Sequence, residues 1–268
     1  MLGDLTVTIT TGSMNRLESL RRALDTWTQL SEVDEIIIVD WGSKEPLRQA
    51  LADFRDPRII IVRTEQRFWC NSKCHNLEIK LARKAGLLFR LDNDTLVRRD
   101  FFVLHPHQKD GFYAGNWRTV PQAVDDKRNL TGTLLCAPKH LLAVNGYNER
   151  LVHYGKEDDD LYARLVASGL CWHELVLEAL DHIPHSDKAR YENLAIAPSV
   201  HKLAAPYQVN RGLSWADRFS GTNAEKSCLI ALSDRILTEK PWTMEDQMTS
   251  WLVNQLDERY YTCCPVKG

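Results

Sequence analysis

The stretch DEIIIVD, residues 34–40, is a run of β-branched residues with acids at both ends. It is too short for a helix and apolar at consecutive positions, so it predicts a strand buried on both faces, as in a parallel sheet. Three similar strands are expected at 5–10 (LTVTIT), 58–64 (RIIIVRT) and 87–94 (LLFRLDND). Helical patterns lie between them, at 15–30, 46–54 and 72–86. This alternation favours an α/β fold with a mostly parallel central sheet flanked by helices.

The second half of the chain has a more mixed pattern. Strands are expected at 111–117, 132–138 and 171–180, and helices at 139–146 and 158–168. From about residue 190 the pattern becomes helical and aromatic. We therefore expect one domain over residues 1–190 and a helical C-terminal extension over 191–268.

Bulk composition restricts the class of protein. The 268 residues include 34 Lys and Arg against 36 Asp and Glu, a net charge of −2, which gives no reason to expect a nucleic-acid partner. The seven cysteines are scattered without a CxxC pair, which speaks against a structural zinc site and fits a reducing cytosol. No leader sequence and no apolar run of about 20 residues is visible. We expect a cytoplasmic protein without a transmembrane segment.

Acidic side chains follow two of the predicted strands. Asp40 ends the 34–40 strand, and Asp92-Asn93-Asp94 ends the 87–94 strand. In a doubly wound sheet, ligands bind beyond the carboxyl ends of the strands. Two carboxylates spaced by one residue can hold Mg²⁺ or Mn²⁺ together with substrate phosphates. A simple turn is the alternative, because Asp and Asn are good turn formers. An EF-hand is excluded, since the required glycine and distal glutamate are missing.

Four adjacent acids, Glu157 to Asp160, stand at the start of the predicted helix 158–168. One or two acids there would be explained by the helix dipole. Four exceed that need, and their repulsion together with partial burial is expected to raise at least one pKa. A carboxylate of this kind, beside an acceptor hydroxyl, is a candidate general base.

Two histidines, His182 and His185, lie in the segment DHIPHSDK. The proline between them places them in a loop. They are either a pair of surface histidines or a source of an imidazole that completes the metal shell of Asp94.

Taken together, these segments resemble a glycosyltransferase of GT-A fold, over roughly residues 5–190. The likeness is to the bacterial chondroitin-polymerase-like family and to the C-terminal half of β-1,4-galactosyltransferases. It rests on EIIIVDWGS (35–43), FWCNSKCHNL (68–77), LDND (91–94) and the long block VNGYNERLVHYGKEDDDLYARL (144–165). The resemblance implies a catalytic domain that uses a nucleotide-sugar and a metal ion.

The resemblance also implies roles for single residues. It assigns the nucleotide-sugar to Thr10, Thr11, Arg16, Asp40, Lys73, Asn76, Asp92 and Asn93. It assigns the metal, Mn²⁺ or Mg²⁺, to Asp94 and His185, with His182 as a possible second imidazole. It assigns the general base to Asp158, and acceptor contacts to Glu157, Asp159 and Tyr154.

The sequence departs from the family pattern at a few positions. Tyr154 stands where the family has tryptophan, and Lys156 where it often has glycine. The resemblance implies that both positions contact the acceptor, so these departures bear on the identity of the acceptor more than on the chemistry. Of the N-terminal FRNR motif of galactosyltransferases, only Asn15 and Arg16 carry over, in TTGSMNR.

We therefore expect a metal-dependent inverting glycosyltransferase that moves a hexose or N-acetylhexosamine from a UDP-sugar to a hydroxyl of a glycan or other acceptor. Three alternatives remain at this point: a retaining enzyme of the same fold, a catalytically silent glycan- or protein-binding module, and a metal-dependent phosphohydrolase. The apolar stripes of the C-terminal extension predict packing on the parent domain, with homodimerisation or docking on a partner as the other possibility. The sugar and the acceptor do not follow from the sequence.

Overall fold

The computed structural model describes residues 5–120, 127, 129–151, 155–186 and 192–194. Within these residues the main sheet has seven strands in the order β3-β2-β1-β4-β7-β6-β8. Its strands are β1 (Val7–Ser13), β2 (Glu35–Asp40), β3 (Ile59–Arg63), β4 (Leu87–Arg90), β6 (Gly111–Ala114), β7 (Leu134–Cys136) and β8 (Cys171–Glu174). The helices are α1 (Leu17–Trp27), α2 (Leu47–Ala50), α3 (Asn71–Leu81), α4 (Phe101–Leu104), α5 (Pro138–Ala143) and α6 (Glu157–Ala167).

The first four strands of the sheet are parallel to one another. Strand β7 runs antiparallel to both β4 and β6, whereas β8 is again parallel to β6. The expected α/β fold with a mostly parallel sheet is therefore confirmed.

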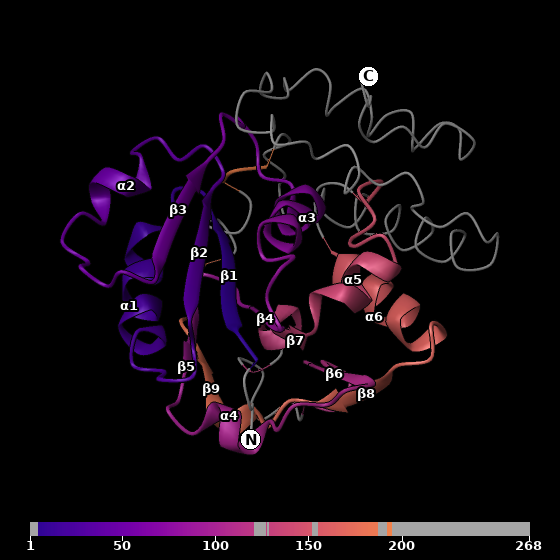
Figure 1. Ribbon diagram of the computed structural model, residues 1–268. Helices are drawn as coiled ribbons and strands as arrows, with labels where there is room; N and C mark the ends of the chain where they lie inside the picture. The colour runs from indigo at the N-terminus through magenta and orange to yellow at the C-terminus, as the bar shows by residue number, and fades with distance from the viewer. Residues whose placement is uncertain (1–4, 121–126, 128, 152–154, 187–191, 195–268) are drawn as a thin grey trace, which may run out of the picture.

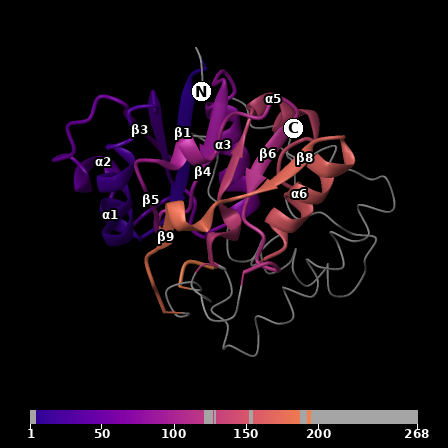
Figure 2. The same cartoon turned by 90° about the horizontal axis from the view of Figure 1, so that it is seen from below.

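Helices cover both faces of the sheet. Helices α1 and α2 lie on one side, and α3, α5 and α6 lie on the other (Figures 1 and 2). Strand β2 shows why, because its apolar residues alternate between the two cores: Ile36 and Ile38 pack in the core beside α1, and Ile37 packs in the core beside α5 and α6. Side chains of successive strand residues point to opposite faces, so a strand apolar at every position needs a cover on each side.

A small second sheet was missed by the sequence patterns. Strand β5 (Thr95–Val97) pairs antiparallel with β9 (Leu180–His182), with Thr95 opposite His182. The predicted strand at 171–180 is wrong in its second half, where the chain leaves β8 and makes a 3₁₀ turn at Leu177–Ala179 before β9. Strand β4 also ends earlier than predicted, at Arg90, so that Asp92 to Asp94 lie in the following turn.

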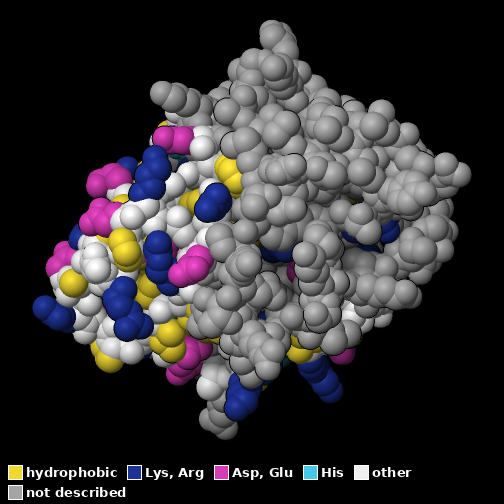
Figure 3. Space-filling view, turned by 90° about the horizontal axis from the view of Figure 1, so that it is seen from above, with side chains coloured by type: hydrophobic (Ala, Val, Ile, Leu, Met, Phe, Trp, Pro, Cys, Tyr) yellow, Lys and Arg dark blue, Asp and Glu magenta, His cyan; other side chains and the backbone are white. Residues whose placement is uncertain are grey.

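The charge balance of the chain is visible on its surface. On the described part of the face in Figure 3, Lys and Arg side chains lie interspersed with Asp and Glu side chains. No helix in the described part of the chain is long and apolar enough to cross a membrane. Tyr154, the domain boundary near residue 190 and the C-terminal extension, with its predicted packing or dimer contacts, lie outside the described residues.

Candidate active site

A cleft of about 450 Å³ opens at the carboxyl ends of β1 and β4. It is bordered by the residues that follow these strands, by the start of α6, and by the segment after β9. Predicted site residues that line it are Arg16, Asp92, Asn93, Asp94, Glu157, Asp158, Asp159, His182 and His185. The fold thus brings both acidic motifs and both histidines to one place, at the edge of the sheet where such folds bind ligands.

One side of the cleft carries a carboxylate with two imidazoles. Asp94 Oδ2 lies 3.2 Å from His185 Nε2 and 3.9 Å from His182 Nε2. The small second sheet creates this contact, because Thr95 pairs with His182 and the Ile183 N–H donates to the Asp94 carbonyl at 2.7 Å.

The electrostatics of this group favour an ionised Asp94. Burial by itself raises the pKa of Asp94, but the hydrogen bond from His185 and the nearby His182 and Arg16 outweigh it and hold the pKa below its usual value. One potential ligand atom from each of Asp94, His182 and His185 lies within 4.8 Å of the others. A carboxylate and two imidazoles in a cleft suit a divalent cation such as Mn²⁺, so these residues fit the expected metal.

The opposite side of the cleft is the start of α6. Gly155 and Lys156 precede the helix with φ of 82° and 80°, a left-handed turn that directs the four acids around the first helical turn. Residues Glu157 to Asp159 line the cleft, whereas Asp160 is fully buried and pairs with Arg164 at 2.8 Å. The tetrad is therefore divided between the cleft and the core.

Among the acids of α6, Asp158 has the most unusual environment. Burial, followed by the charge of Glu157, raises its pKa to about 8. Its Oδ1 lies 3.4 Å from the Tyr147 hydroxyl and 3.9 Å from Arg90 Nη1. A carboxyl group with a pKa near neutrality and an open path to a cleft can accept a proton from a bound hydroxyl.

The two neighbours of Asp158 have partners of their own. Asn71 donates a hydrogen bond to Glu157. Asp159 accepts from Lys156 Nζ at 2.7 Å and lies 3.4 Å from Arg118. Burial opposes ionisation of Asp159, but Lys156 and Arg118 lower its pKa below the usual value. Asp159 is therefore a fixed anion beside Asp158.

The turn after β4 contributes the donor-side polar groups. The Arg90 guanidinium donates to Asp92 Oδ1 at 2.7 Å, and the Asn93 amide donates to Ser13 Oγ at 3.1 Å. Arg16 Nη1 reaches Asp94 Oδ2 at 3.3 Å. The loops after β1 and β4 are thus held together across the cleft.

Several residues assigned to the nucleotide-sugar are not among the residues that line the cleft. Thr10 and Thr11 lie inside β1 with no exposed surface, and the Thr10 hydroxyl donates to Glu78 under α3. Asn76 is also fully buried, where its amide bonds the backbone of Tyr147 on both sides.

Two further assignments to the nucleotide-sugar differ from the geometry. Asp40 is fully buried and accepts hydrogen bonds from the backbone of Ser43 and Leu47 and from Arg63. These bonds fix the turn after β2. Lys73 lies on α3 and is not among the residues that line the cleft.

Among the residues that line the cleft and that the sequence patterns missed are an arginine and two tryptophans. Arg90 is the last residue of the apolar strand β4, and Trp69 and Trp117 come from loops. A single arginine in an otherwise apolar buried strand was the available signal, because a buried charge requires a partner. No comparable signal marked the two tryptophans.

Comparison with protein families identifies the domain. Residues 8–151 match the model described as glycosyl transferase family 2, which is more than half of the chain. Residues 123–187 match a model described as the N-terminal domain of galactosyltransferase. No curated protein matches the chain by sequence.

Solved structures share the fold at low sequence identity. GalNAc-T7 with UDP, GalNAc and Mn²⁺ superposes with a TM-score of 0.58 at 13% identity, covering 80% of this chain and 50% of that one. A variant of Drosophila β1,4-galactosyltransferase 7 with manganese, UDP-Gal and xylobiose gives 0.51 at 14% identity, covering 74% and 79%. The chain therefore spans half the length of the GalNAc-T7 structure.

The sheet order, the flanking helices and these neighbours agree with the expected GT-A fold. The family match extends from the start of β1 to the residues just before α6 and includes the turn that carries Asp92 to Asp94. The chain belongs to glycosyl transferase family 2.

Proposed function

We propose that this glycosyltransferase moves a hexose or N-acetylhexosamine from a UDP-sugar to a hydroxyl of a glycan acceptor, with inversion at the anomeric carbon. The observation that carries the proposal is the position of Asp158, whose pKa is raised to about 8, in the same cleft as the Asp94–His182–His185 group. UDP and manganese in the GalNAc-T7 structure, and UDP-Gal and xylobiose in the galactosyltransferase structure, support the class of donor and acceptor.

In this proposal the metal ligands are Asp94 and His185, joined by His182. When bound, Mn²⁺ or Mg²⁺ would neutralise charge on the diphosphate of the leaving UDP. Arg16, which lies 3.3 Å from Asp94, would add positive charge on the side of the cleft next to β1. Asp92 and Asn93, in the same turn as Asp94, would contact the sugar or nucleotide of the donor.

The ionised carboxylate of Asp158 would accept the proton of the acceptor hydroxyl. The hydroxyl oxygen then forms the new bond to the anomeric carbon, and the bond from that carbon to the UDP oxygen breaks with its electrons going to UDP. A single displacement inverts the configuration, so an α-linked donor gives a β-glycoside. Glu157 and Asp159, which flank the base in the cleft, would orient the acceptor.

The proposal is tested by incubating the purified chain with Mn²⁺, a panel of UDP-sugars and a panel of glycan acceptors. We expect UDP release that requires both the metal and an acceptor, and a product whose NMR spectrum shows an inverted anomeric linkage. The control is Asp158→Asn in the same panel. A product that retains the anomeric configuration of the donor would show a retaining mechanism and contradict the proposed inversion. If no donor gave UDP release, the proposed activity would be refuted.

A further inference from the structure

Arg90 lines the cleft, although the residue is only 5% exposed. Its guanidinium has partners in four directions. It donates to Asp92 Oδ1 at 2.7 Å and to the Gly132 carbonyl, lies 3.9 Å from Asp158 Oδ1, and contacts His75 Nε2. Arg90 is therefore the charged group that lies between Asp92 and the proposed base.

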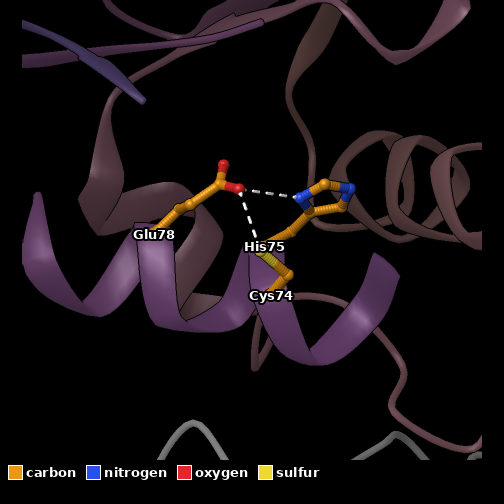
Figure 4. A group of neighbouring side chains, drawn as sticks. All are labelled: Cys74, His75 and Glu78. Carbon is orange, nitrogen blue, oxygen red and sulfur yellow. Dashed lines mark hydrogen bonds and ion pairs between the residues drawn. The ribbon is translucent and has the colours of Figure 1, made fainter. Parts of the chain in front are cut away.

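Behind Arg90, a chain of buried polar groups continues away from the cleft along α3. His75 Nδ1 lies 3.1 Å from Glu78 Oε1, and Glu78 Oε2 accepts from the Thr10 hydroxyl at 3.2 Å. Figure 4 shows that the side chains of Cys74 and His75 both interact with the Glu78 carboxylate. His75 and Glu78 are 2% and 0% exposed, so neither side chain contacts substrate.

Cys74, His75 and Glu78 also present three potential metal-ligand atoms within 4.8 Å of one another. Three observations disfavour a metal ion at this position. The Glu78 carboxylate already accepts from His75, Cys74 and Thr10, and the positive Arg90 lies against the other nitrogen of His75. Burial, followed by the charge of Glu78, raises the pKa of Cys74 well above its ordinary value, which disfavours the thiolate form that a metal ion would need as a ligand.

The hydrogen-bonding roles of His75 follow from its two neighbours. Arginine has donors only, so the Nε2 atom facing Arg90 must be the acceptor. The ring proton is then on Nδ1 and is donated to the Glu78 carboxylate. The negative Glu78 thus selects the one neutral tautomer of His75 that can accept from Arg90, in the same way that a carboxylate hydrogen-bonded to a metal-bound histidine fixes the tautomer of that histidine.

We propose that Glu78 and His75 are positioning residues for sugar transfer, which fix the Arg90 guanidinium between Asp92 and Asp158 and thereby favour the ionised base. This inference rests on the proposed function, because it gives Asp158 the role of base. An unrestrained arginine could turn wholly toward Asp92 and leave Asp158 without a positive neighbour. With His75 and the Gly132 carbonyl holding two of its amino groups, the guanidinium remains within reach of both carboxylates.

The electrostatics of Asp158 agree with this role. Its pKa is raised chiefly by burial, next by Glu157, and further by Asp92 and Asp159, whereas Arg90 is the group that opposes these effects. The other groups that face it are the Tyr147 hydroxyl and the ring of Tyr162. Weaker positioning of Arg90 should therefore move the acid limb of the pH–rate profile to higher pH.

The experiment compares two neutral substitutions of one residue, His75→Asn and His75→Gln. The asparagine amide can replace Nδ1 toward Glu78 but is too short to reach Arg90. The glutamine amide oxygen can replace Nε2 as the acceptor for Arg90. We expect His75→Asn to move the acid limb up by about one pH unit, and so to lower turnover at pH 7 about tenfold. The KM for the donor should change less than about threefold, and His75→Gln should recover most of the shift in the acid limb.

A second variant covers the case in which His75→Asn does not fold. If His75→Asn does not fold, as judged by circular dichroism, Glu78→Gln takes its place, because it keeps the side-chain shape but removes the charge that selects the tautomer. The proposal would be overturned if the folded variant kept the acid limb of the wild-type pH–rate profile. It would also be overturned if His75→Asn and His75→Gln shifted the acid limb equally.

Nitrogen-15 NMR of the wild-type histidine side chains tests the chain of hydrogen bonds without any turnover. We expect His75 protonated at Nδ1 only at pH 7, and a proton on Nε2 would overturn the inference. If wild-type protein releases no UDP but the Nδ1 tautomer is found, the proposed function fails while the hydrogen-bond chain stands. The two failures are thus distinguishable.

Discussion

The imidazole of His185 lies 3.2 Å from the carboxylate of Asp94, although the two residues are 91 positions apart in the sequence (185 − 94). The pairing of β5 with β9 brings them together. We expect Asp94→Asn and His185→Ala each to weaken Mn²⁺ binding at least about tenfold, measured by isothermal titration calorimetry, because each removes one donor of a small ligand set. The matched control is Asp181→Asn, an exposed carboxylate on β9 beside His182. Equal loss in the control would refute the ligand assignment.

Replacing Asp158 by Asn should lower turnover by at least about 100-fold, the usual contribution of a general base. In wild-type protein, the pKa of Asp158 is raised to about 8, and only its ionised form accepts the proton. We therefore expect kcat/KM to rise with pH up to about 8 and to fall about tenfold per unit below it. Initial rates from pH 5.5 to 9.5 measure this rise of kcat/KM with pH. If the Asp158→Asn variant showed the same rise, the titrating group would be another residue.

The same raised pKa makes a prediction about stability. The folded protein binds the proton of Asp158 more tightly than the unfolded chain does, because the pKa of Asp158 in the unfolded chain is near 3.8. Ionisation of Asp158 therefore leaves the free energy of unfolding unchanged below about pH 4. It lowers this free energy progressively between pH 4 and 8, and its destabilising effect is largest above pH 8. Asp158→Asn should be more stable than wild type at pH 8.5, by on the order of a few kcal/mol, with the difference shrinking toward pH 4. Urea unfolding without metal at both pH values tests the sign.

Asn76→Ala separates a structural from a binding role. The buried Asn76 amide bonds the Tyr147 N–H at 2.7 Å and the Tyr147 carbonyl at 2.9 Å, and the variant leaves these backbone groups without those bonds. We expect unfolding free energy to fall by about 2–3 kcal/mol, with the KM for the UDP-sugar nearly unchanged. Thermal melts and donor kinetics below the melting temperature measure the two effects. A large rise in donor KM with normal stability would restore Asn76 to the donor site.

The sequence patterns predicted β1 to β4 well, because fully buried parallel strands require long β-branched runs such as 34–40. They missed β5 and β9, because the three residues of each carry no signal that separates them from the segments directly before them. For the site, residues that follow a strand end were placed correctly in the cleft, as for Asp94. Residues within an element were not so placed: Thr10 belongs to a strand covered by α3, and its hydroxyl donates to Glu78 and does not line the cleft. Only the three-dimensional cover of each strand decides between these outcomes.

Lys156 holds a left-handed backbone conformation, with φ of 80°, directly before the acids of α6. A non-glycine residue pays about 1–2 kcal/mol there, because its Cβ crowds the following carbonyl. Its amine also donates to Asp159 at 2.7 Å, so the side chain has a partner in the cleft. Lys156→Gly removes both the Cβ and the amine, whereas Lys156→Met removes only the charge and keeps the backbone strain.

The difference in unfolding free energy between these two variants therefore isolates the backbone term. We expect Lys156→Gly to be more stable than Lys156→Met by about 1 kcal/mol in urea unfolding. Both variants remove one of the groups that lower the pKa of Asp159, while Arg118 remains. Asp159 should stay ionised at pH 7 in both, so the two variants should share the same acceptor KM. If the glycine variant were the less stable one, the turn before α6 would be held by contacts of the Lys156 stem, and backbone strain would not be its main cost.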